Sequence, residues 1–378
     1  MPCRVAYIDP RSLASGAPTN HPFFNPDRLL IAHSLFESAG LLDGSLVFEP
    51  PLSEEKDLLR FHDDAYVDFV KSANKLGLTY LDNGDTPVFE SVYENSSKRV
   101  GGALKLVSIV LEGDVDHGFH MGGGLHHAHP DRASGFCVFN DVGVCISKLK
   151  DMGLKRLAYV DIDAHHGDGV HYGFYEDPGV LNIDFHEDGR YLFPGSGHTD
   201  EIGDGAARGF KVNVPLLPDS SDRSFLYAFN ELVPPLIRAF EPEFILFQCG
   251  GDSHKGDPLT GLSLTTRSYH AASKMLHELA HELSEGRIVA FGGGGYNIPN
   301  VARCWAVVFS NLLGLEPKNA LPAEWVEEVK FRLNVDPGHH LLDPEVGGAE
   351  NSSAYERAKA VVSEIKGMVF PILGIRHD

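Results

Sequence analysis

Residues 157–170 have the sequence LAYVDIDAHHGDGV, in which an apolar strand runs directly into a cluster of ionisable side chains. Asp161, Asp163, His165, His166 and Asp168 fall within eight positions. Burying that many charges costs several kcal/mol for each uncompensated group. The cluster must therefore be neutralised by a ligand or lie open to water. The remaining sequence indicates which of these two possibilities holds.

Six other short apolar runs have the same character as the start of this stretch. They are VAYID near residue 5, SLVFEP near 45, VLNIDF near 180, FKVNVPL near 210, FILFQCG near 244 and RIVAFGG near 287. Most are typical of strands buried on both faces. Helical patterns lie between them, among them 25–40 with Asn25 as a cap and 265–286 with Thr265 as a cap. The alternation predicts an α/β fold, with three layers (α/β/α) around a mostly parallel central sheet.

The chain shows no repeat, low-complexity linker or clear boundary. We therefore expect a single domain over residues 1–378, with a surface loop near 333–353 and a final helix in SSAYERAKAVVSEIKG. The formal charge of −21 and the lack of clustered Lys and Arg argue against nucleic-acid binding. No apolar run is long enough for a bilayer, and the opening residues lack a signal-peptide pattern, so no membrane association and a cytoplasmic location are expected. Five widely spaced cysteines are typical of reduced thiols.

Four polar segments follow strands or apolar runs, at 121–141, 161–169, 248–259 and 291–297. In parallel α/β sheets, ligands bind outside the carboxyl ends of the strands. The four segments are thus predicted to converge on one active site.

Asp163 and His165 lie two positions apart, so at a strand end they point to the same side. Asp252 from another segment would complete a three-point metal site. One imidazole and two carboxylates indicate a catalytic divalent site, with zinc (Zn²⁺) as the first choice and ferrous iron as the alternative. The competing interpretation is a set of helix-capping aspartates around a hydrogen-bonded histidine.

His126 and His127 form an adjacent pair in a glycine-rich loop. Alone, such a pair is ordinary. Asp161 and Asp168 could each accept a hydrogen bond from one imidazole, which would fix its tautomer and tune its basicity. The four side chains are predicted to act as an acid/base pair with two orienting carboxylates.

Tyr296 follows four glycines, which allow close backbone approach and could present its hydroxyl to a cavity. No Lys-Ser/Thr follows the glycines, so a phosphate-binding loop is not favoured. A phenol facing a metal suits the stabilisation of an oxyanion.

Taken together, the four segments resemble the signature blocks of the zinc-dependent histone deacetylase family, and the chain is most similar to its bacterial acetoin-utilisation branch. The likeness extends from HPFFNPDRL to the terminal helix. It implies the arginase/deacetylase fold and the removal of acetyl groups from the Nε atom of lysine in proteins or peptides. The roles that it implies are zinc ligands at Asp163, His165 and Asp252, acid/base histidines at His126 and His127 with Asp161 and Asp168 as their partners, and carbonyl polarisation by Tyr296.

The resemblance also implies a set of substrate-binding residues. Leu259 would stand at the tunnel mouth, where enzymes selective for acetylated polyamines place a glutamate. The other members of the set are Gly135, Phe136 and Phe193 in the tunnel that holds the acyl-lysine stem, Asp85 at the rim and Arg28 at the internal channel behind the metal.

The family also holds a structural potassium ion, whose implied ligands are Asp161 and the backbone carbonyls of Asp163 and His165. Asp184 stands where the family usually has a serine ligand, so the identity of this ion stays open. His254, in GGDSHKGDPL, has no assigned role. Three further histidines, His270, His277 and His281, are expected to be surface residues.

Three alternatives remain. An acetylpolyamine amidohydrolase would share the site. An arginase- or agmatinase-like enzyme would hold two manganese ions and needs an Asp-x-Asp pair where Asp252 and His254 stand. A non-enzymatic acetyl-lysine-binding module would need a lost ligand or tyrosine, and every matched position is intact. The expected partners are acetylated lysines of proteins or peptides, and the oligomeric state does not follow from the sequence.

Overall fold

The fold was analysed in a computed structural model that describes residues 3–15, 25–345 and 352–376. Its strands are β1 (Val5–Ile8), β2 (Leu46–Phe48), β3 (His117–His120), β4 (Leu157–Asp161), β5 (Val180–Glu187), β6 (Lys211–Leu216), β7 (Phe244–Gln248) and β8 (Ile288–Phe291). They form one eight-stranded sheet in the order β2-β1-β3-β8-β7-β4-β5-β6, and every pairing is parallel. The predicted parallel α/β sheet is confirmed.

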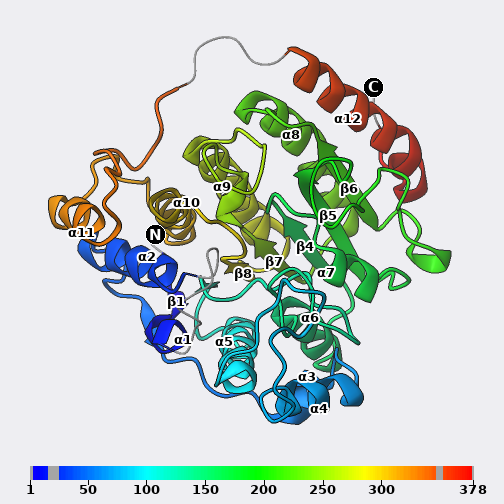
Figure 1. Cartoon of the computed structure of the whole chain (residues 1–378). Coiled ribbons are helices and arrows are strands. Elements are labelled where there is room, and N and C mark those ends of the chain that lie inside the picture. The colour runs from blue at the N-terminus through cyan, green and yellow to red at the C-terminus, as the bar shows by residue number, and fades with distance from the viewer. Residues whose placement is uncertain (1–2, 16–24, 346–351, 377–378) are drawn as a thin grey trace.

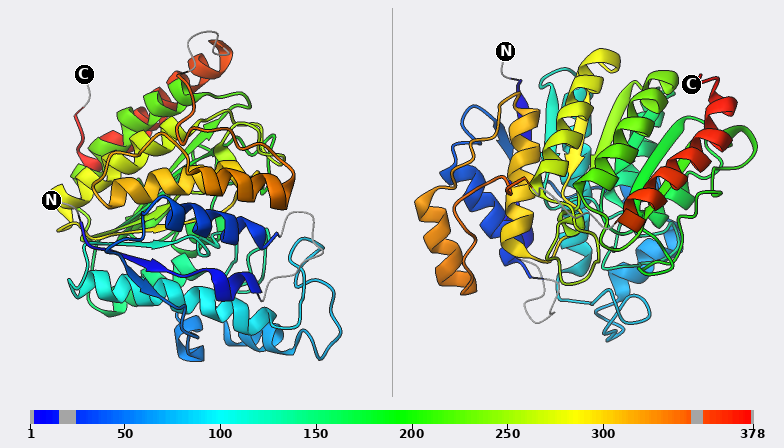
Figure 2. Two further views of the ribbon diagram at one scale, coloured as in Figure 1. Left: turned by 90° about the vertical axis from the view of Figure 1, so that its left-hand side faces the viewer. Right: turned by 90° about the horizontal axis from the view of Figure 1, so that it is seen from above.

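The helices of the described residues lie on both faces of this sheet. They are α1 (Arg11–Ser15), α2 (Asp27–Ser38), α3 (Glu55–Leu58), α4 (Asp64–Ser72), α5 (Val92–Leu111), α6 (Asp141–Asp151), α7 (Asp168–Gly173), α8 (Asp222–Phe240), α9 (Thr266–Leu283), α10 (Ile298–Leu312), α11 (Ala323–Leu333) and α12 (Ser352–Leu373), with short 3-10 turns at Gly205–Ala207 and Gly251–Ser253. Helices α8, α9, α10 and α12 cover one face, and α5 and α6 cover the other (Figures 1 and 2). The molecule thus has the three layers that the sequence predicts.

All seven runs predicted as strands are strands, and the structure adds an eighth, β3. Its sequence, HGFH, contains two histidines and a glycine, so it has neither the apolar nor the β-branched character that identifies a buried strand. It is nevertheless fully buried in the middle of the sheet, between β1 and β8. The position of β3 therefore depends on its neighbours rather than on its own residues.

The starts of two predicted helices can be compared with the structure, and one of them moves slightly. Helix α2 begins at Asp27 with Pro26 at the cap position, while the Asn25 side chain accepts a hydrogen bond from the Asp27 N–H at 2.9 Å. Helix α9 begins as predicted, after Thr265, whose hydroxyl accepts from the Arg267 N–H.

The predicted surface loop near 333–353 is only partly a surface loop. Residues 346–351 lie outside the described residues. Leu341 and Asp343 are buried, and Asp343 accepts hydrogen bonds from Thr266 and Arg303. The other residues between 334 and 345 are exposed or half-buried, so the loop has one inward-packed part, at 341–343, that its polar composition did not indicate. None of the helices in the described ranges is long and apolar enough to cross a membrane.

Candidate active site

The four polar segments meet at the carboxyl edge of the sheet. They follow β3, β4, β7 and β8, which are consecutive in the order β3-β8-β7-β4. Because all strands are parallel, their carboxyl ends lie at the same edge, as the sequence predicts.

Asp163, His165 and Asp252 form a compact buried group whose ligand atoms all lie within 4.8 Å of one another. His165 Nδ1 is 3.2 Å from Asp163 Oδ1 and 3.0 Å from Asp252 Oδ2. The opposite carboxylate oxygens are held by backbone donors, since Gly294 N–H donates to Asp163 Oδ2 at 2.7 Å and Ala164 N–H to Asp252 Oδ1 at 2.9 Å. These outer bonds hold the two carboxylates so that their other oxygens face His165.

The electrostatics of this group favour a bound cation. Burial opposes protonation of His165, but its hydrogen bonds to Asp163 and Asp252 raise its pKa to about 10. Burial and the neighbouring charge of Asp163 raise the pKa of Asp252. Two buried carboxylates that compete for one positive imidazole are undercompensated, and a divalent cation removes the imbalance. The donor set therefore fits a catalytic divalent metal with room for a further ligand.

Two glycines make this approach of carboxylates possible. A Cβ atom on Gly250 would lie 1.9 Å from Asp163 Oδ2, and one on Gly294 would lie 2.1 Å from Asp252 Oδ2. Any side chain at either position would push a carboxylate out of the group. The glycine-rich segment after β8 is thus explained by close approach to the ligands.

His126 and His127 are each held by a carboxylate. The distance from His126 Nδ1 to Asp161 Oδ2 is 2.8 Å, and from His127 Nδ1 to Asp168 Oδ1 it is 2.7 Å. The two Nε2 atoms lie 3.1 Å apart. The structure thus has the two pairings expected from the sequence, and the two Nε2 atoms lie within hydrogen-bond distance of one another.

The two carboxylates sit in different surroundings. Burial and the nearby Asp184 raise the pKa of Asp161, which also accepts a hydrogen bond from the Tyr159 hydroxyl at 2.5 Å. Burial alone would raise the pKa of Asp168, but its bonds to His127 and His129 hold it below the usual range. The bond to His129 was missed by the sequence reasoning, although this residue stands two positions after the pair. Burial lowers the pKa of His127 to about 4.

Tyr296 is positioned by its backbone. Its N–H donates to Asp257 Oδ2 at 2.8 Å, while the other oxygen of Asp257 accepts from the Leu259 N–H at 3.0 Å. Burial and Asp252 raise the pKa of the Tyr296 hydroxyl, so it stays protonated near neutral pH. Asp257 was not identified from the sequence, and the DP pair at 257–258, a turn-forming dipeptide, is the signal that could have found it.

Arg28 lines the same cavity as the three candidate metal ligands and donates hydrogen bonds to the glycine-rich loop after β8. Its Nη1 donates to the carbonyl oxygens of Gly293 and Gly295, both at 3.1 Å. It also lines an inner cavity together with Arg99, beside the metal ligands. Its expected place at an internal channel stays a prediction.

A passage leads from the surface to this group. The predicted tunnel, rim and gate residues line a single pocket, with Leu192 as an additional member. Phe193 is 42% exposed, and its ring packs edge-on against that of His127 at a centroid distance of 5.2 Å. Phe136 lies at a centroid distance of 6.0 Å from Tyr296. The full lining is Asp85, His127, Gly135, Phe136, His165, Leu192, Phe193, Leu259 and Tyr296.

Both carboxylate oxygens of Asp184 already have partners within the protein. One oxygen accepts from the Gly167 N–H at 2.9 Å, and the other lies 2.7 Å from His186 Nδ1. Burial opposes protonation of His186, but Asp184 raises its pKa. Asp184 stands directly beside Asp161 in the register of β5 and β4. Asp161 and Asp184 thus form a buried acidic pair beside His186.

His254 is directed away from the metal group. Its Nε2 lies 2.9 Å from Asp343 Oδ2, and Arg303 donates to the other oxygen of that carboxylate. The ligand set of a binuclear manganese centre is therefore not assembled from Asp252 and His254.

The comparisons with known proteins point the same way. Residues 21–312 match the model of the histone deacetylase domain. The chain is 40% identical over 314 residues to the acetoin utilization protein AcuC of Bacillus subtilis (strain 168), covering 81% of each chain. It is 39% identical over 322 residues to the AcuC protein of Staphylococcus aureus (strain COL), covering 82% of each.

Two solved structures are also similar. One is an HDAC homologue in complex with SAHA, at 29% identity and a TM-score of 0.85, and the other is an HDAC homologue from Aquifex aeolicus, at 28% identity and a TM-score of 0.85. Each match covers 96% of this chain and 100% of the other. The chain therefore belongs to the histone deacetylase family and is a deacetylase of the acetoin-utilisation type.

Proposed function

We propose that the chain removes acetyl groups from the Nε atom of lysine in proteins or peptides, with zinc held by Asp163, His165 and Asp252. The observation that carries the proposal is the meeting of this group with the His126–His127 pair and Tyr296 at the inner end of one passage. Zinc at this position would polarise the acetyl carbonyl and lower the pKa of water in the site.

The histidine pair would move the protons. With each Nδ1 directed at a carboxylate, each Nε2 can hold a proton that faces the passage. One Nε2 takes a proton from water as that water attacks the acetyl carbon, and a proton passes back to the lysine nitrogen as the C–N bond breaks. Acetate and the free amine leave. Two Nε2 atoms 3.1 Å apart favour one shared proton, which suits a pair that alternates between base and acid.

Tyr296 would donate its hydroxyl proton in a hydrogen bond to the carbonyl oxygen as negative charge develops there. Its raised pKa keeps it a donor. The backbone bond to Asp257 and the Arg28 bonds to the glycine loop hold its segment in place before substrate arrives.

The passage favours a peptide over an acetylated polyamine. Leu259 stands at its mouth and offers no charge for a distal ammonium, whereas it can pack against an uncharged peptide backbone. Asp85 at the rim could accept hydrogen bonds from backbone N–H groups. An acetylpolyamine amidohydrolase is the second candidate, supported by the formal charge of −21.

The remaining parts of the proposal concern the setting of the site. A potassium ion, or another monovalent cation, would bind near Asp161 and Asp184. The deacetylase domain would span residues 1–378. The five free cysteines support a reducing, cytoplasmic location.

Turnover of an acetyl-lysine peptide and of N-acetylspermidine, measured on one preparation of known zinc and iron content, tests the proposal. We expect the higher kcat/KM on the peptide, with activity that follows the zinc content. A higher kcat/KM on the polyamine would contradict the substrate, and activity that follows iron alone would contradict the metal.

A further inference from the structure

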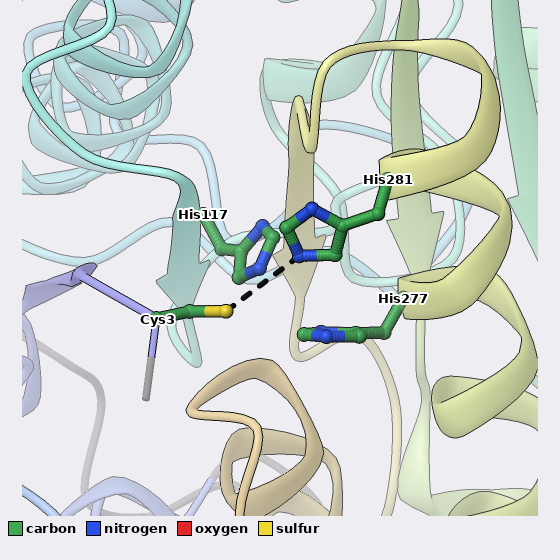
Figure 3. A group of neighbouring side chains, drawn as sticks. All are labelled: Cys3, His117, His277 and His281. Atoms are coloured by element: carbon green, nitrogen blue, oxygen red, sulfur yellow. Dashed lines mark hydrogen bonds between the residues drawn. The ribbon is translucent and has the colours of Figure 1, made fainter. Parts of the chain in front are cut away.

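A second group of metal-ligand side chains lies at the opposite edge of the sheet. Cys3 precedes β1, His117 is the first residue of β3, and His277 and His281 come from α9. Figure 3 shows the four side chains pointing toward one another. Their ligand atoms lie within 4.8 Å of one another, and the proposed active site draws on none of them.

The chain presents these residues from rigid elements. His277 and His281 are four positions apart on α9, so they lie on the same face of the helix. Their stretch, HELAH, has the spacing with which two helical histidines bind one zinc ion. His117 is fixed by the pairing of β3 with β1 and β8, in which it stands opposite Val5 and Ile288.

His117 carries an independent sign of a missing ligand. Its side chain is 0% exposed, and its Nδ1 lies 2.7 Å from the Gly286 carbonyl oxygen, to which it must donate. Nε2 is then the unprotonated nitrogen, and within the described residues it has no hydrogen-bond partner. A donor bond from one ring nitrogen to a carbonyl, with the other nitrogen free, is the usual arrangement of a metal-bound histidine. Nδ1 of His277 is likewise buried without a partner in that part of the chain.

The remaining geometry fits zinc. Zn–S and Zn–N bonds of about 2.3 and 2.0 Å at tetrahedral angles place sulfur and nitrogen roughly 3.5 Å apart. The distance from Cys3 Sγ to His281 Nε2 is 3.6 Å. Ring centroids of the three histidines are 4.7–5.0 Å apart. Gly286 leaves room for the His281 ring, because a Cβ atom at position 286 would lie 3.1 Å from that ring.

The pKa values of His117 and His277 are compatible with metal binding. Burial and the adjacent His277 lower the pKa of His117 to about 3, and burial and His281 lower that of His277 to about 4. Both rings are therefore neutral ligands near pH 7. Burial and Asp116 raise the pKa of Cys3, so metal binding must release the thiol proton.

We propose that Cys3, His117, His277 and His281 bind one Zn²⁺ ion as a closed structural site, separate from the active site. Four protein ligands leave no open position for substrate, which distinguishes the site from a metalloprotease centre built on the same helical spacing. Cys3 and His281 are accessible enough for the ion to enter, since Cys3 is half-buried and His281 is exposed. The ion would join the start of β1 to β3 and to the end of α9.

Zinc analysis of the full-length enzyme tests the site. We expect the Cys3→Ser/His281→Ala variant to hold one zinc equivalent less than wild type, with deacetylase kcat changed by less than about twofold. His270→Ala, a half-buried histidine on the same helix, is the control and should keep the full content. Equal zinc in the double variant and wild type would overturn the proposal and leave a thiol that is merely hydrogen-bonded to His281.

Cobalt substitution gives a second readout that does not depend on activity. The active-site donors are oxygen and nitrogen, so a sulfur-to-cobalt charge-transfer band would report on the second site alone. We expect Cys3→Ser to abolish the band and Cys137→Ser to leave it. A band absent from the cobalt-loaded wild type, or one that survives Cys3→Ser, would refute the assignment. Because Cys3→Ser is a small change at a half-buried position, its circular dichroism should match wild type, and zinc should raise the Tm of wild type by more than that of Cys3→Ser, which keeps only the active-site ion.

Discussion

The two edges of the sheet carry metal-ligand groups of opposite design. At the carboxyl edge, two carboxylates and one imidazole lie at the end of a passage, and at the amino edge, one thiol and three imidazoles lie close together, with Cys3 half-buried and His281 exposed. In the proposed active site, the first group would keep negative charge and an open position, both of which catalysis needs. The second has softer donors and no vacancy, which suits structure. The strands between them are only four or five residues long at β3, β7 and β8.

The largest effect is expected from a substitution that removes one member of the group at the carboxyl edge. Asp252→Ala should lower the metal content by one equivalent and the deacetylase kcat by more than about 10³-fold, because two remaining ligands hold a divalent ion weakly. Atomic emission analysis and acetate release measure both. A variant with unchanged metal content would show that Asp252 is not a ligand. In the same variant, the group at the amino edge should keep its zinc.

Tyr296→Phe leaves the metal ligands untouched and removes one hydrogen-bond donor. We expect a loss of roughly 10²–10³ in kcat with unchanged metal content, as for the loss of one oxyanion donor. Tyr227→Phe, on the α8 face that packs against Tyr355, is the matched control and should retain activity. Near-normal turnover by Tyr296→Phe would reduce this tyrosine to a loop residue.

A third cluster, made of His254, Arg303 and Asp343, has residue types similar to those of the two ligand groups, but its members pair with one another. Burial alone would raise the pKa of Asp343, but its hydrogen bond with His254 and the charge of Arg303 hold it well below its usual range. A carboxylate with a lowered folded-state pKa stabilises the protein above its unfolded pKa, and this contribution is lost as the pH falls toward the folded value. Asp343→Asn should therefore cost roughly 2 kcal/mol of unfolding free energy at pH 7 and less near about pH 3.

Urea unfolding at the two pH values measures this difference, with Glu345→Gln as the exposed control. A cost that is the same at both pH values would show that the charge of Asp343 does not matter. Metal analysis of Asp343→Asn should match wild type, since His254 is not expected to bind an ion.

The smallest effect concerns the mouth of the passage. Leu259→Glu should move the ratio of kcat/KM values toward N-acetylspermidine and away from an acetyl-lysine peptide by about five- to tenfold, the effect of one partly exposed ion pair. Leu259→Gln has the same shape without the charge and should leave the ratio near that of wild type. If both variants shift the ratio equally, size rather than charge controls the choice.

The sequence allowed most of the group of side chains at the carboxyl edge to be predicted. It did not predict the group of four at the amino edge. Asp163, His165 and Asp252 stand in long, ordered segments after strong strand patterns, so their meeting follows from the parallel sheet. Asp257 and His129 were missed because a side chain that holds backbone or bonds to another side chain has no spacing rule of its own.

His117 escaped for a different reason. Its strand, HGFH, lacks a strand pattern, and without β3 nothing places this residue beside α9. His270, His277 and His281 were expected at the surface, but only His281 is exposed, and His270 and His277 are half-buried. The HELAH spacing was a usable local signal, but a long-range group of ligands needs the fold before it can be recognised.

Asp257 has a consequence for anyone who redesigns this enzyme. Its two oxygens accept hydrogen bonds from the backbone of Tyr296 and of Leu259, so the proposed oxyanion donor and the proposed gate residue share one anchor. Loop grafts that alter selectivity at 257–259 without the partner loop at 292–296 would displace the tyrosine as well. Selectivity and rate should then change together, and a library that varies both loops as one unit should yield more active variants than libraries that vary either alone.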